Sequence, residues 1–277
     1  MTETVKAIEK DVELWDGKIR LNVKIIGSGP ALLYLPPAEG CALSPFLAQL
    51  AGHFTVYIPD FPGTTLGNQR SIPEIGDLWD LVLVYEEILR TLGLERPVLV
   101  GASFGGLLAA ELAANFPCRF SQVILIAPLG LWRDDLPVKN WIAAPPAKVA
   151  ELLFFDPLAE AVQKYVALPI EPNAAAAVSA ARTWALGCAG TYIWPMPDKG
   201  LSKRLHRIEA QTLIIWGRED GIMSPAYAEE FGRRIRRSSV ATIPKAGHYP
   251  HIEQAEATYK FLADFLADTR TLTARLA

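Results

Sequence analysis

Ser103, Asp220 and His248 are three residues whose types and order could together make a nucleophile. Ser103 lies in a G-x-S-x-G sequence, directly after the apolar run 97–100 and before a helical pattern of leucines and alanines. In that strand–turn–helix setting, a serine sits on a tight turn that holds its hydroxyl out at the top of a sheet. The free N–H groups of the helix that follows would favour negative charge developing there. The motif therefore predicts a nucleophilic serine.

A serine hydroxyl is a weak nucleophile until a base takes its proton, so a histidine is needed. Two of the chain's four histidines lie in segments that predict surface or packing positions, His53 before a strand-like run and His206 in a basic stretch. His248 follows the strand-like residues 240–243, which puts it on a loop at the same sheet edge as the serine. His251 belongs to the same loop and is the main alternative. We favour His248 as the base.

The base in turn needs an acid that fixes its tautomer and stabilises the imidazolium. Asp220 follows the apolar run 212–216, which predicts a buried strand, and so lies on a strand-end loop. An aspartate there is often only a turn or cap residue, but its place in the order serine, aspartate, histidine favours the role of the acid. Glu219 could substitute for it, and Asp134 or Asp135 are more distant alternatives.

The elements that must position these residues predict an α/β fold. Two extended segments come first, near residues 5–14 and 19–26, and an Asp-Gly turn joins them. Strands and helices then alternate, a pattern that builds a mostly parallel central sheet with helices on both faces. Residues 71–74 have capping-box spacing. We expect them to open a helix whose apolar side chains recur at helical intervals as far as Leu89.

These motifs together resemble those of serine members of the α/β-hydrolase superfamily, and the resemblance covers nearly the whole chain. Residues 27–35 are similar to the family's glycine-rich turn into its third strand, and residues 57–63 to the segment after its fourth strand. The G-x-S-x-G elbow and the segments that carry Asp220, His248 and Glu253 complete the series. The resemblance implies the α/β-hydrolase fold and a Ser-His-Asp triad, and we expect no cofactor and no metal.

The loop after the third strand departs from the family's pattern. The family usually has His-Gly there, whereas this chain has Pro36-Pro37, and proline has no N–H that could bind an oxyanion. The family's donor follows that pair and maps to Ala38, and the second donor would be the N–H of Phe104, next after the nucleophile. Two prolines could hold the loop rigidly, or they could re-aim it and spoil the oxyanion hole. We expect a functional oxyanion hole.

An inserted helical cap is also implied by the resemblance. Between residues 131 and 207 the strand pattern stops, prolines are frequent, and four of the chain's seven tryptophans occur. We therefore expect a core domain of residues 1–130 and 208–277 and a cap of residues 131–207. Ligand pockets are mostly apolar, so aromatic residues of this insertion are expected to line the substrate pocket. The candidates are Trp132, Trp141, Trp184 and Trp194, with Phe154, Phe155, Tyr192 and Met196 as further ones.

The predicted chemistry is acyl transfer through an acyl-enzyme. His248 would take the proton of Ser103, the serine would attack a carbonyl carbon, and water would later release the acyl group. A small, largely apolar carboxylic ester is the simplest substrate class. One alternative is a carbon–carbon bond hydrolase of the meta-cleavage-product type, because those relatives use a similar triad and cap. Another is a non-catalytic small-molecule receptor on the same scaffold, since catalysis depends on the donor beside the two prolines.

The composition agrees with one α/β domain that carries an insertion, because 277 residues can bury a large core. A net charge of −3 provides no basic field for nucleic acid or an anionic membrane, and we interpret the basic run 233–237 as a solvated helix end. Three widely spaced cysteines argue against a disulfide framework or a zinc site. No signal-peptide pattern opens the chain. We expect a cytoplasmic protein with a small-molecule substrate and neither nucleic acid nor membrane as partner; no signal indicates an oligomeric state.

Overall fold

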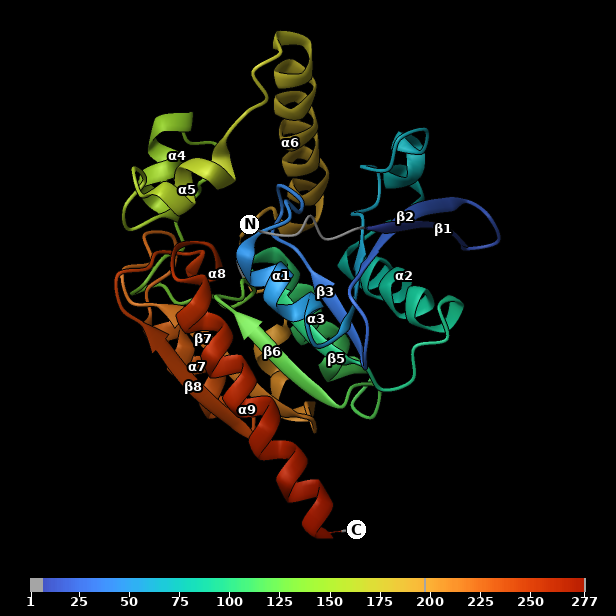
Figure 1. Ribbon diagram of the computed structural model, residues 1–277, viewed down its shortest axis with the longest axis vertical. Helices are drawn as coiled ribbons and strands as arrows, with labels where there is room; N and C mark the ends of the chain where they lie inside the picture. The colour runs from blue at the N-terminus through green and yellow to red at the C-terminus, as the bar shows by residue number, and fades with distance from the viewer. Residues whose placement is uncertain (1–6, 197, 277) are drawn as a thin grey trace.

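A single twisted sheet forms the centre of the computed structural model, which describes residues 7–196 and 198–276 (Figure 1). Its strands span Ile8–Leu14 (β1), Ile19–Ile26 (β2), Ala31–Leu35 (β3), Thr55–Pro59 (β4), Val98–Ala102 (β5), Gln122–Ile126 (β6), Gln211–Gly217 (β7) and Ser238–Ile243 (β8). Their order across the sheet is β1-β2-β4-β3-β5-β6-β7-β8. Strands β3 to β8 run parallel, whereas β2 pairs antiparallel with both β1 and β4. The prediction of a mostly parallel sheet is confirmed.

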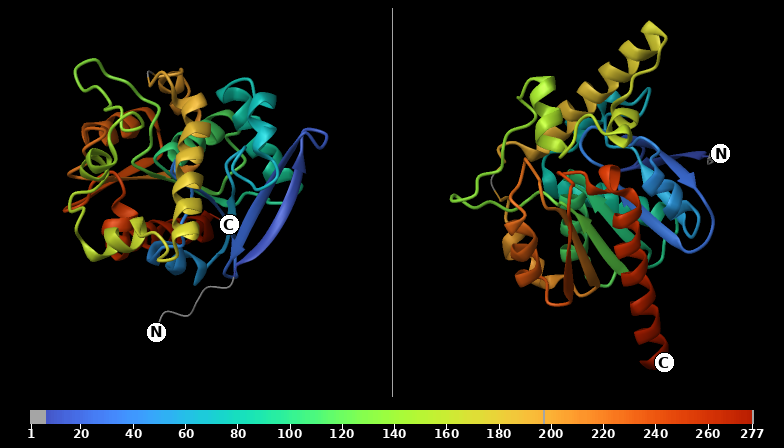
Figure 2. Two further views of the ribbon diagram at one scale, coloured as in Figure 1. Left: turned by 90° about the horizontal axis from the view of Figure 1, so that it is seen from above. Right: turned by 60° about the vertical axis from the view of Figure 1, so that its left-hand side comes forward.

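Helices cover both faces of this sheet (Figures 1 and 2). They span Pro45–Ala51 (α1), Leu78–Thr91 (α2), Phe104–Asn115 (α3), Pro146–Leu153 (α4), Glu160–Val166 (α5), Pro172–Ile193 (α6), Ala226–Arg234 (α7), Pro250–Glu253 (α8) and Ala255–Leu276 (α9). In β5, Val98 and Val100 pack with α1 and α9, while Leu99 packs with α2, α3 and α7 on the opposite face. Because both faces are covered, β5 and β6 are buried along their whole length.

The two predicted extended segments form an antiparallel hairpin, β1 and β2, in which Ile8 is opposite Ile25 and Leu14 is opposite Ile19. The turn between them has three successive residues with positive φ, at positions 15–17, and closes with a hydrogen bond of 3.2 Å from the Lys18 N–H. Residues 5 and 6, the start of the first predicted segment, lie outside the described residues.

The predicted start of the helix after residue 71 is wrong. Residues 69–74 form a 3₁₀ turn, and α2 begins only at Leu78. The Asp77 carboxylate accepts hydrogen bonds of 2.8 and 2.9 Å from N–H groups in the first turn of α2. Such an N-cap satisfies donors that have no partner inside the helix. Asp77 therefore takes the capping role that the spacing of residues 71–74 suggested for Ser71.

The basic run near residue 233 is a helix end, as predicted. Arg233 and Arg234 lie in the last turn of α7, and both pair with Glu230 one turn earlier. Cations at this end complement the helix dipole.

The three cysteines of the chain are free thiols. None of the described helices combines the length and the apolar character that a bilayer span requires.

Between β6 and β7 the chain leaves the sheet and forms the helical cap that was expected (Figures 1 and 2). Helices α4, α5 and α6 belong to this insertion, and no strand occurs in its described residues. The C-terminal part of α6 packs on the core through buried residues such as Cys188 and Tyr192, whereas its N-terminal half stands away from the rest of the molecule (Figure 1). The chain returns to the sheet through two 3₁₀ turns, Leu201–Lys203 and Leu205–Arg207.

Candidate active site

Ser103 occupies a strained turn between β5 and α3. Its φ of 54° and ψ of −114° lie in a region that residues with a side chain rarely adopt. Hydrogen bonds hold this backbone in place: the Ser103 N–H donates to the Ile126 carbonyl at 2.9 Å, and the Ser103 carbonyl accepts from the N–H groups of Leu107 and Leu129 at 3.1 Å. The surrounding strands and helix thus impose the conformation that projects the hydroxyl.

Two glycines make room for this turn. A Cβ on Gly101 would lie 2.3 Å from the Gly105 carbonyl oxygen, and a Cβ on Gly105 would lie 2.1 Å from the Leu35 carbonyl oxygen. Both distances are far below a van der Waals contact, so only glycine fits at either position. The second contact also brings the loop that follows β3 against the first turn of α3. Glycine at the elbow therefore serves the approach of a neighbouring loop as well as the turn.

The side chains of Ser103, His248 and Asp220 form one hydrogen-bonded line. Ser103 Oγ lies 2.9 Å from His248 Nε2, and His248 Nδ1 lies 2.7 Å from Asp220 Oδ2. The His248 and Asp220 side chains are fully buried. Asp220 also accepts hydrogen bonds from the Trp216 indole at 2.9 Å and from two backbone N–H groups at 2.8 and 3.0 Å. These donors hold the carboxylate in the orientation that receives the imidazole.

The alternative acids do not reach His248. Glu219, the neighbour of Asp220, accepts a backbone N–H at 3.1 Å in the loop that follows β8. Asp134 accepts an indole N–H at 2.9 Å, and Asp135 pairs with an arginine. Each of these carboxylates has a structural partner away from the imidazole.

Among the histidines, the structure brings only His248 to Ser103. His53 and His206 are exposed. His251 is buried against Phe46, with 5.7 Å between the ring centroids, and its Nδ1 has no hydrogen-bond partner in the described part of the chain. Burial lowers the pKa of His251 to about 3. The alternative base is therefore a neutral packing residue.

Two backbone N–H groups near Ser103 could hold a negatively charged oxygen. Phe104 is the first residue of α3, so its N–H has no acceptor within the helix. Ala38 is buried in the loop after β3 that passes against Gly105. In the described residues, neither N–H donates to a protein acceptor. Pro36 and Pro37 thus leave the predicted donors available.

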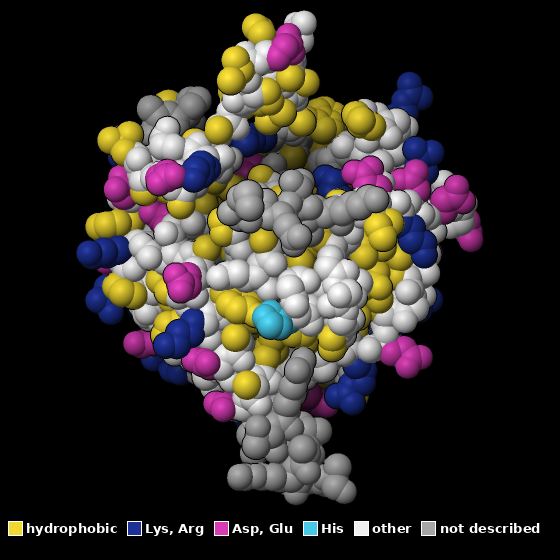
Figure 3. All heavy atoms as spheres, in the orientation of Figure 1, with side chains coloured by type: hydrophobic (Ala, Val, Ile, Leu, Met, Phe, Trp, Pro, Cys, Tyr) yellow, Lys and Arg dark blue, Asp and Glu magenta, His cyan; other side chains and the backbone are white. Residues whose placement is uncertain are grey.

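A cavity of about 790 Å³ opens between the core and the cap. Its wall is mostly apolar. Trp141, one of the lining residues, has its ring centroid 6.4 Å from that of His248, whereas Ser103 and His248 are not themselves among the lining residues. The cap contributes apolar surface above it, and Figure 3 shows hydrophobic side chains over much of the protruding part of α6. The residues that line the cavity include Glu39, Phe61, Trp141, Phe154, Tyr165 and Arg182.

Comparison with known proteins agrees with this geometry. A family model described as "Alpha/beta hydrolase family" matches residues 32–261. The chain belongs to this family. The relatives of this hydrolase include a dienoate hydrolase and a methyl ester esterase, so the family establishes hydrolysis but not the substrate.

Two curated relatives illustrate that range. The chain is 25% identical over 269 residues to a 2-hydroxy-6-oxo-6-phenylhexa-2,4-dienoate hydrolase from Burkholderia cepacia, covering 90% of this chain and 92% of the relative. It is 24% identical over 265 residues to a pimeloyl-[acyl-carrier protein] methyl ester esterase from Shewanella woodyi, covering 89% and 97%. The crystal structure of a membrane phospholipase A shares the fold, with a TM-score of 0.77 and 21% identity over 95% of this chain and 87% of that one.

Of the four tryptophans predicted for the pocket of this alpha/beta hydrolase, only Trp141 lines the large cavity. The Trp132 indole N–H binds Asp134 at 2.9 Å, and the Trp184 indole N–H binds the Gly63 carbonyl at 2.7 Å. Trp184 and Trp194 are 49% and 57% exposed. Trp132, Trp184 and Trp194 are not among the residues that line the cavity.

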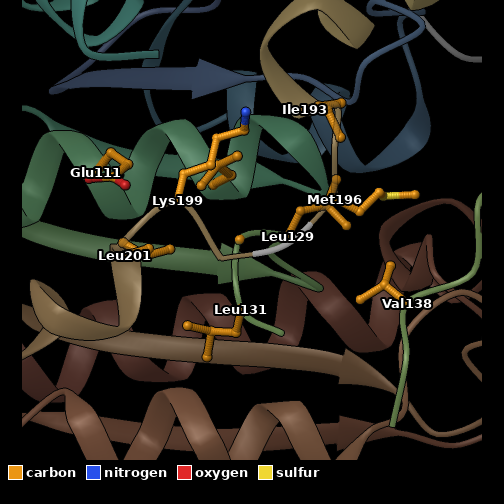
Figure 4. A pocket seen from close by; sticks show the side chains of 10 residues that line it. Glu111, Leu129, Leu131, Val138, Ile193, Met196, Lys199 and Leu201 are labelled. Carbon is orange, nitrogen blue, oxygen red and sulfur yellow. The ribbon is translucent and has the colours of Figure 1, made fainter. Parts of the chain in front are cut away.

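Of the further candidates, some line the large cavity and others lie elsewhere. Phe154 lines the large cavity, whereas Phe155 is half exposed. Tyr192 is buried, and its hydroxyl donates to the Ile75 carbonyl at 3.2 Å, just after the 3₁₀ turn of residues 69–74. Met196 lines a second pocket beside α3 (Figure 4). That pocket holds only about 20 Å³, roughly the room of one water molecule. It is too small for a substrate.

The sequence reasoning missed three polar residues of the site. Glu39 and Arg182 line the large cavity, and the Tyr249 hydroxyl donates a hydrogen bond of 2.5 Å to Glu39 Oε1. Burial raises the pKa of both Glu39 and Tyr249. A signal for Glu39 and Tyr249 was present in the sequence: each directly follows a residue assigned to the reaction, Ala38 and His248.

Proposed function

We propose that this hydrolase cleaves a small, largely apolar carboxylic ester through an acyl-enzyme on Ser103. The observation that carries the proposal is the buried line from Ser103 through His248 to Asp220, with distances of 2.9 and 2.7 Å. With its Nδ1–H donated to Asp220, the imidazole presents the Nε2 lone pair to the serine hydroxyl. His248 then takes the proton as Ser103 Oγ attacks the carbonyl carbon, and returns it to the leaving alcohol.

The oxyanion would be held by the backbone N–H groups of Ala38 and Phe104. Donors that point at the developing charge before the reaction begins cost no reorganisation in the transition state. The N-terminus of α3 adds a favourable dipole at the same place. Water activated by His248 would then release the acyl group from Ser103. Because neither N–H group donates to a protein acceptor among the described residues, these donors support catalysis over the receptor alternative.

The substrate class rests on the cavity wall. Trp141, Phe154 and Phe61 present apolar rings, which favour an apolar acyl or alcohol group. In this proposal, residues 131–207 act as the cap and residues 1–130 and 208–277 as the core that carries the triad. A cytoplasmic location stays a prediction from the sequence.

Carbon–carbon bond hydrolysis is the second candidate. One observation favours it: the guanidinium of Arg182 lies in the wall of the cavity, where it could pair with the carboxylate of a dienoate such as the one named for the Burkholderia cepacia relative. The same triad would serve that reaction. Hydrolysis of an ester and hydrolysis of a dienoate would therefore use the same nucleophile. The two reactions would differ in the groups of the substrate that the cavity binds.

Substitution of the nucleophile tests the proposal. Ser103→Ala is expected to reduce kcat on 4-nitrophenyl butyrate by about 10⁴- to 10⁶-fold, because the attacking atom is lost. A fluorophosphonate should label the wild type at Ser103 and leave the variant unlabelled. Thermal unfolding serves as the control and should barely change. A variant that keeps near-normal turnover would refute the assignment, and turnover of 2-hydroxy-6-oxo-6-phenylhexa-2,4-dienoate without turnover of esters would favour the second candidate.

A further inference from the structure

Glu39 and Tyr249 join two segments that are far apart in the sequence. Glu39 follows the candidate oxyanion donor Ala38, and Tyr249 follows the candidate base His248. Their side chains meet in a hydrogen bond of 2.5 Å from the Tyr249 hydroxyl to Glu39 Oε1, across 210 positions of the chain. One contact therefore connects the loop after β3 to the loop after β8.

The tyrosine end of this contact is held rigidly. Tyr249 is fully buried, and its ring lies between rings of the core and the cap. The centroid distances are 5.4 Å to His248, 5.6 Å to His251, 5.8 Å to Phe154 and 6.3 Å to Tyr165. Aromatic side chains packed at such distances occupy one orientation in a dense interior. Tyr249 can therefore serve as a fixed anchor for the carboxyl group that it binds.

The glutamate end belongs to a loop that packs against Gly105 but makes few backbone hydrogen bonds in the described structure. Pro36 and Pro37 cannot donate backbone hydrogen bonds. The described backbone bonds of the loop include one of 3.0 Å from Gly40 to the Pro37 carbonyl, which lies within the loop itself. Glu39 Oε2 is buried and has no partner among the described residues. The bond to Tyr249 thus ties this loop to the segment that carries His248.

We propose that Glu39 is a positioning residue, which, held by Tyr249, fixes the backbone N–H of Ala38 where the oxyanion forms. The inference rests on the proposed function, since it assigns to Ala38 the role of an oxyanion donor. A displacement of about 1 Å in a catalytic group can cost as much as 100-fold in rate. The tether therefore acts on the transition state through Ala38, without contact between Glu39 and the reacting atoms.

The charge of Glu39 is compatible with this role. An ionised carboxylate beside the oxyanion hole would repel the developing negative charge. Burial raises the pKa of Glu39 and so favours the neutral acid, although the Tyr249 hydrogen bond and the charges of His248 and Arg182 act in the opposite direction. Arg182 does not pair with Glu39 in the described structure, because its guanidinium donates to the carbonyls of Tyr165 and Val166 at 3.2 and 2.9 Å.

A double-mutant cycle tests the tether. Glu39→Ala and Tyr249→Phe are each expected to lower kcat on 4-nitrophenyl butyrate by about 10- to 100-fold, below the about 10²- to 10³-fold cost of losing an oxyanion donor outright. KM should change little, because the hole acts in the transition state. The Tyr249 hydroxyl also interacts with the Ser103 side chain, so Tyr249→Phe can lose more than Glu39→Ala. The double variant should lose no more than Tyr249→Phe alone, because the contact with Glu39 is already broken there. Glu39→Gln keeps an acceptor for Tyr249 and should restore most of kcat.

Tyr227→Phe is the matched control. Tyr227 is also fully buried, and its hydroxyl donates to the Leu136 carbonyl at 2.8 Å and accepts from the Arg133 N–H at 2.8 Å, away from the cavity. The kcat of the Tyr227→Phe variant should equal that of the wild type. Losses that add in the double variant, or a Glu39→Gln variant as slow as Glu39→Ala, would overturn the tether. If Glu39→Ala does not fold, the kcat values of Tyr249→Phe and Glu39→Gln still test the tether: the first variant should be slow and the second close to the wild type.

Failure of the tether differs from failure of the proposed function. If Ser103→Ala abolishes turnover while Glu39→Ala and Tyr249→Phe keep wild-type kcat, the serine mechanism stands and the positioning role is wrong. If Ser103→Ala stays active, the mechanism itself is wrong.

Discussion

At the scale of single residues, His251 differs most from its neighbour His248, although the two lie on one short segment. His248 has a hydrogen-bond partner on each ring nitrogen. His251 is buried with an unpartnered Nδ1, and burial followed by the charge of His248 lowers its pKa to about 3. Its ring is uncharged at neutral pH and packs against Phe46 and Tyr249. Environment therefore separates the candidate base from a packing residue.

This difference predicts an acid-sensitive fold. The pKa of His251 is lower in the folded protein than the ordinary value of about 6.5, so the unfolded chain binds more protons between the two values. Folding stability from this residue is complete above pH 6.5 and is lost as the pH falls towards 3, by up to roughly 5 kcal/mol. Urea unfolding of the wild type and of His251→Leu across this range measures it. The wild type should lose stability relative to the variant, and parallel curves would contradict the assignment.

At the scale of elements, two helical glycines differ in the space around them: Gly105 in the elbow is enclosed, whereas Gly187 in the cap is open to a side chain. Gly105 lies where α3 begins and the loop after β3 passes, and a Cβ there would meet the Leu35 carbonyl at 2.1 Å. Gly187 lies in the middle of α6, and a Cβ there would meet nothing within 4 Å. The first position is closed by a neighbouring element, while the second is open. The same substitution should therefore have effects of opposite sign.

Gly105→Ala is expected to lower the free energy of unfolding by about 1–3 kcal/mol or more, because backbone must move to admit the methyl group. It should also reduce kcat, since the displaced loop carries Ala38. Gly187→Ala should raise the free energy of unfolding by about 0.5–1 kcal/mol, the helix propensity difference between the residues. Chemical unfolding checks both. A Gly105→Ala variant as stable as the wild type would show that the close approach at the elbow does not require glycine.

At the scale of the whole molecule, an ion pair joins the end of the cap to the core. Arg204, where the chain returns from the cap, binds Glu111 of α3 with two hydrogen bonds, of 2.9 Å from Nε and 2.6 Å from a terminal nitrogen. The Glu111 side chain is almost completely buried. A paired, planar contact of this kind also restricts the direction in which the chain leaves the cap.

Breaking the pair on one side is expected to be costly. Arg204→Met leaves the buried Glu111 carboxylate without its partner and should lower the free energy of unfolding by about 3–5 kcal/mol. The double variant Arg204→Met, Glu111→Leu should recover most of that loss, because no buried charge remains. Urea unfolding of the three proteins checks the expectation. A double variant that stays as unstable as Arg204→Met would mean that the pair itself supplies net stability.

Local patterns were sufficient for much of this fold. The apolar runs predicted β5 and β7, and the turn residues after them predicted which side chains lie at the edge of the sheet. The G-x-S-x-G spacing predicted the elbow, because the steric demands of such a turn concern only five neighbouring residues. The start of α2 was misplaced since two capping signals competed within a few positions, and the stronger acceptor, Asp77, took the role.

Contacts between distant segments required the folded chain. The order of residues suggested Asp220 over Glu219, but only the paths of the loops after β7 and β8 bring its carboxylate to 2.7 Å from His248. Which tryptophan faces the cavity depends on how the cap helices rotate against the core, and composition carries no information on that rotation. The bond between Glu39 and Tyr249 spans 210 positions and has no local periodicity that could announce it. Chain-local sterics and hydrophobicity thus determine elements, while the packing of loops decides which polar atoms meet.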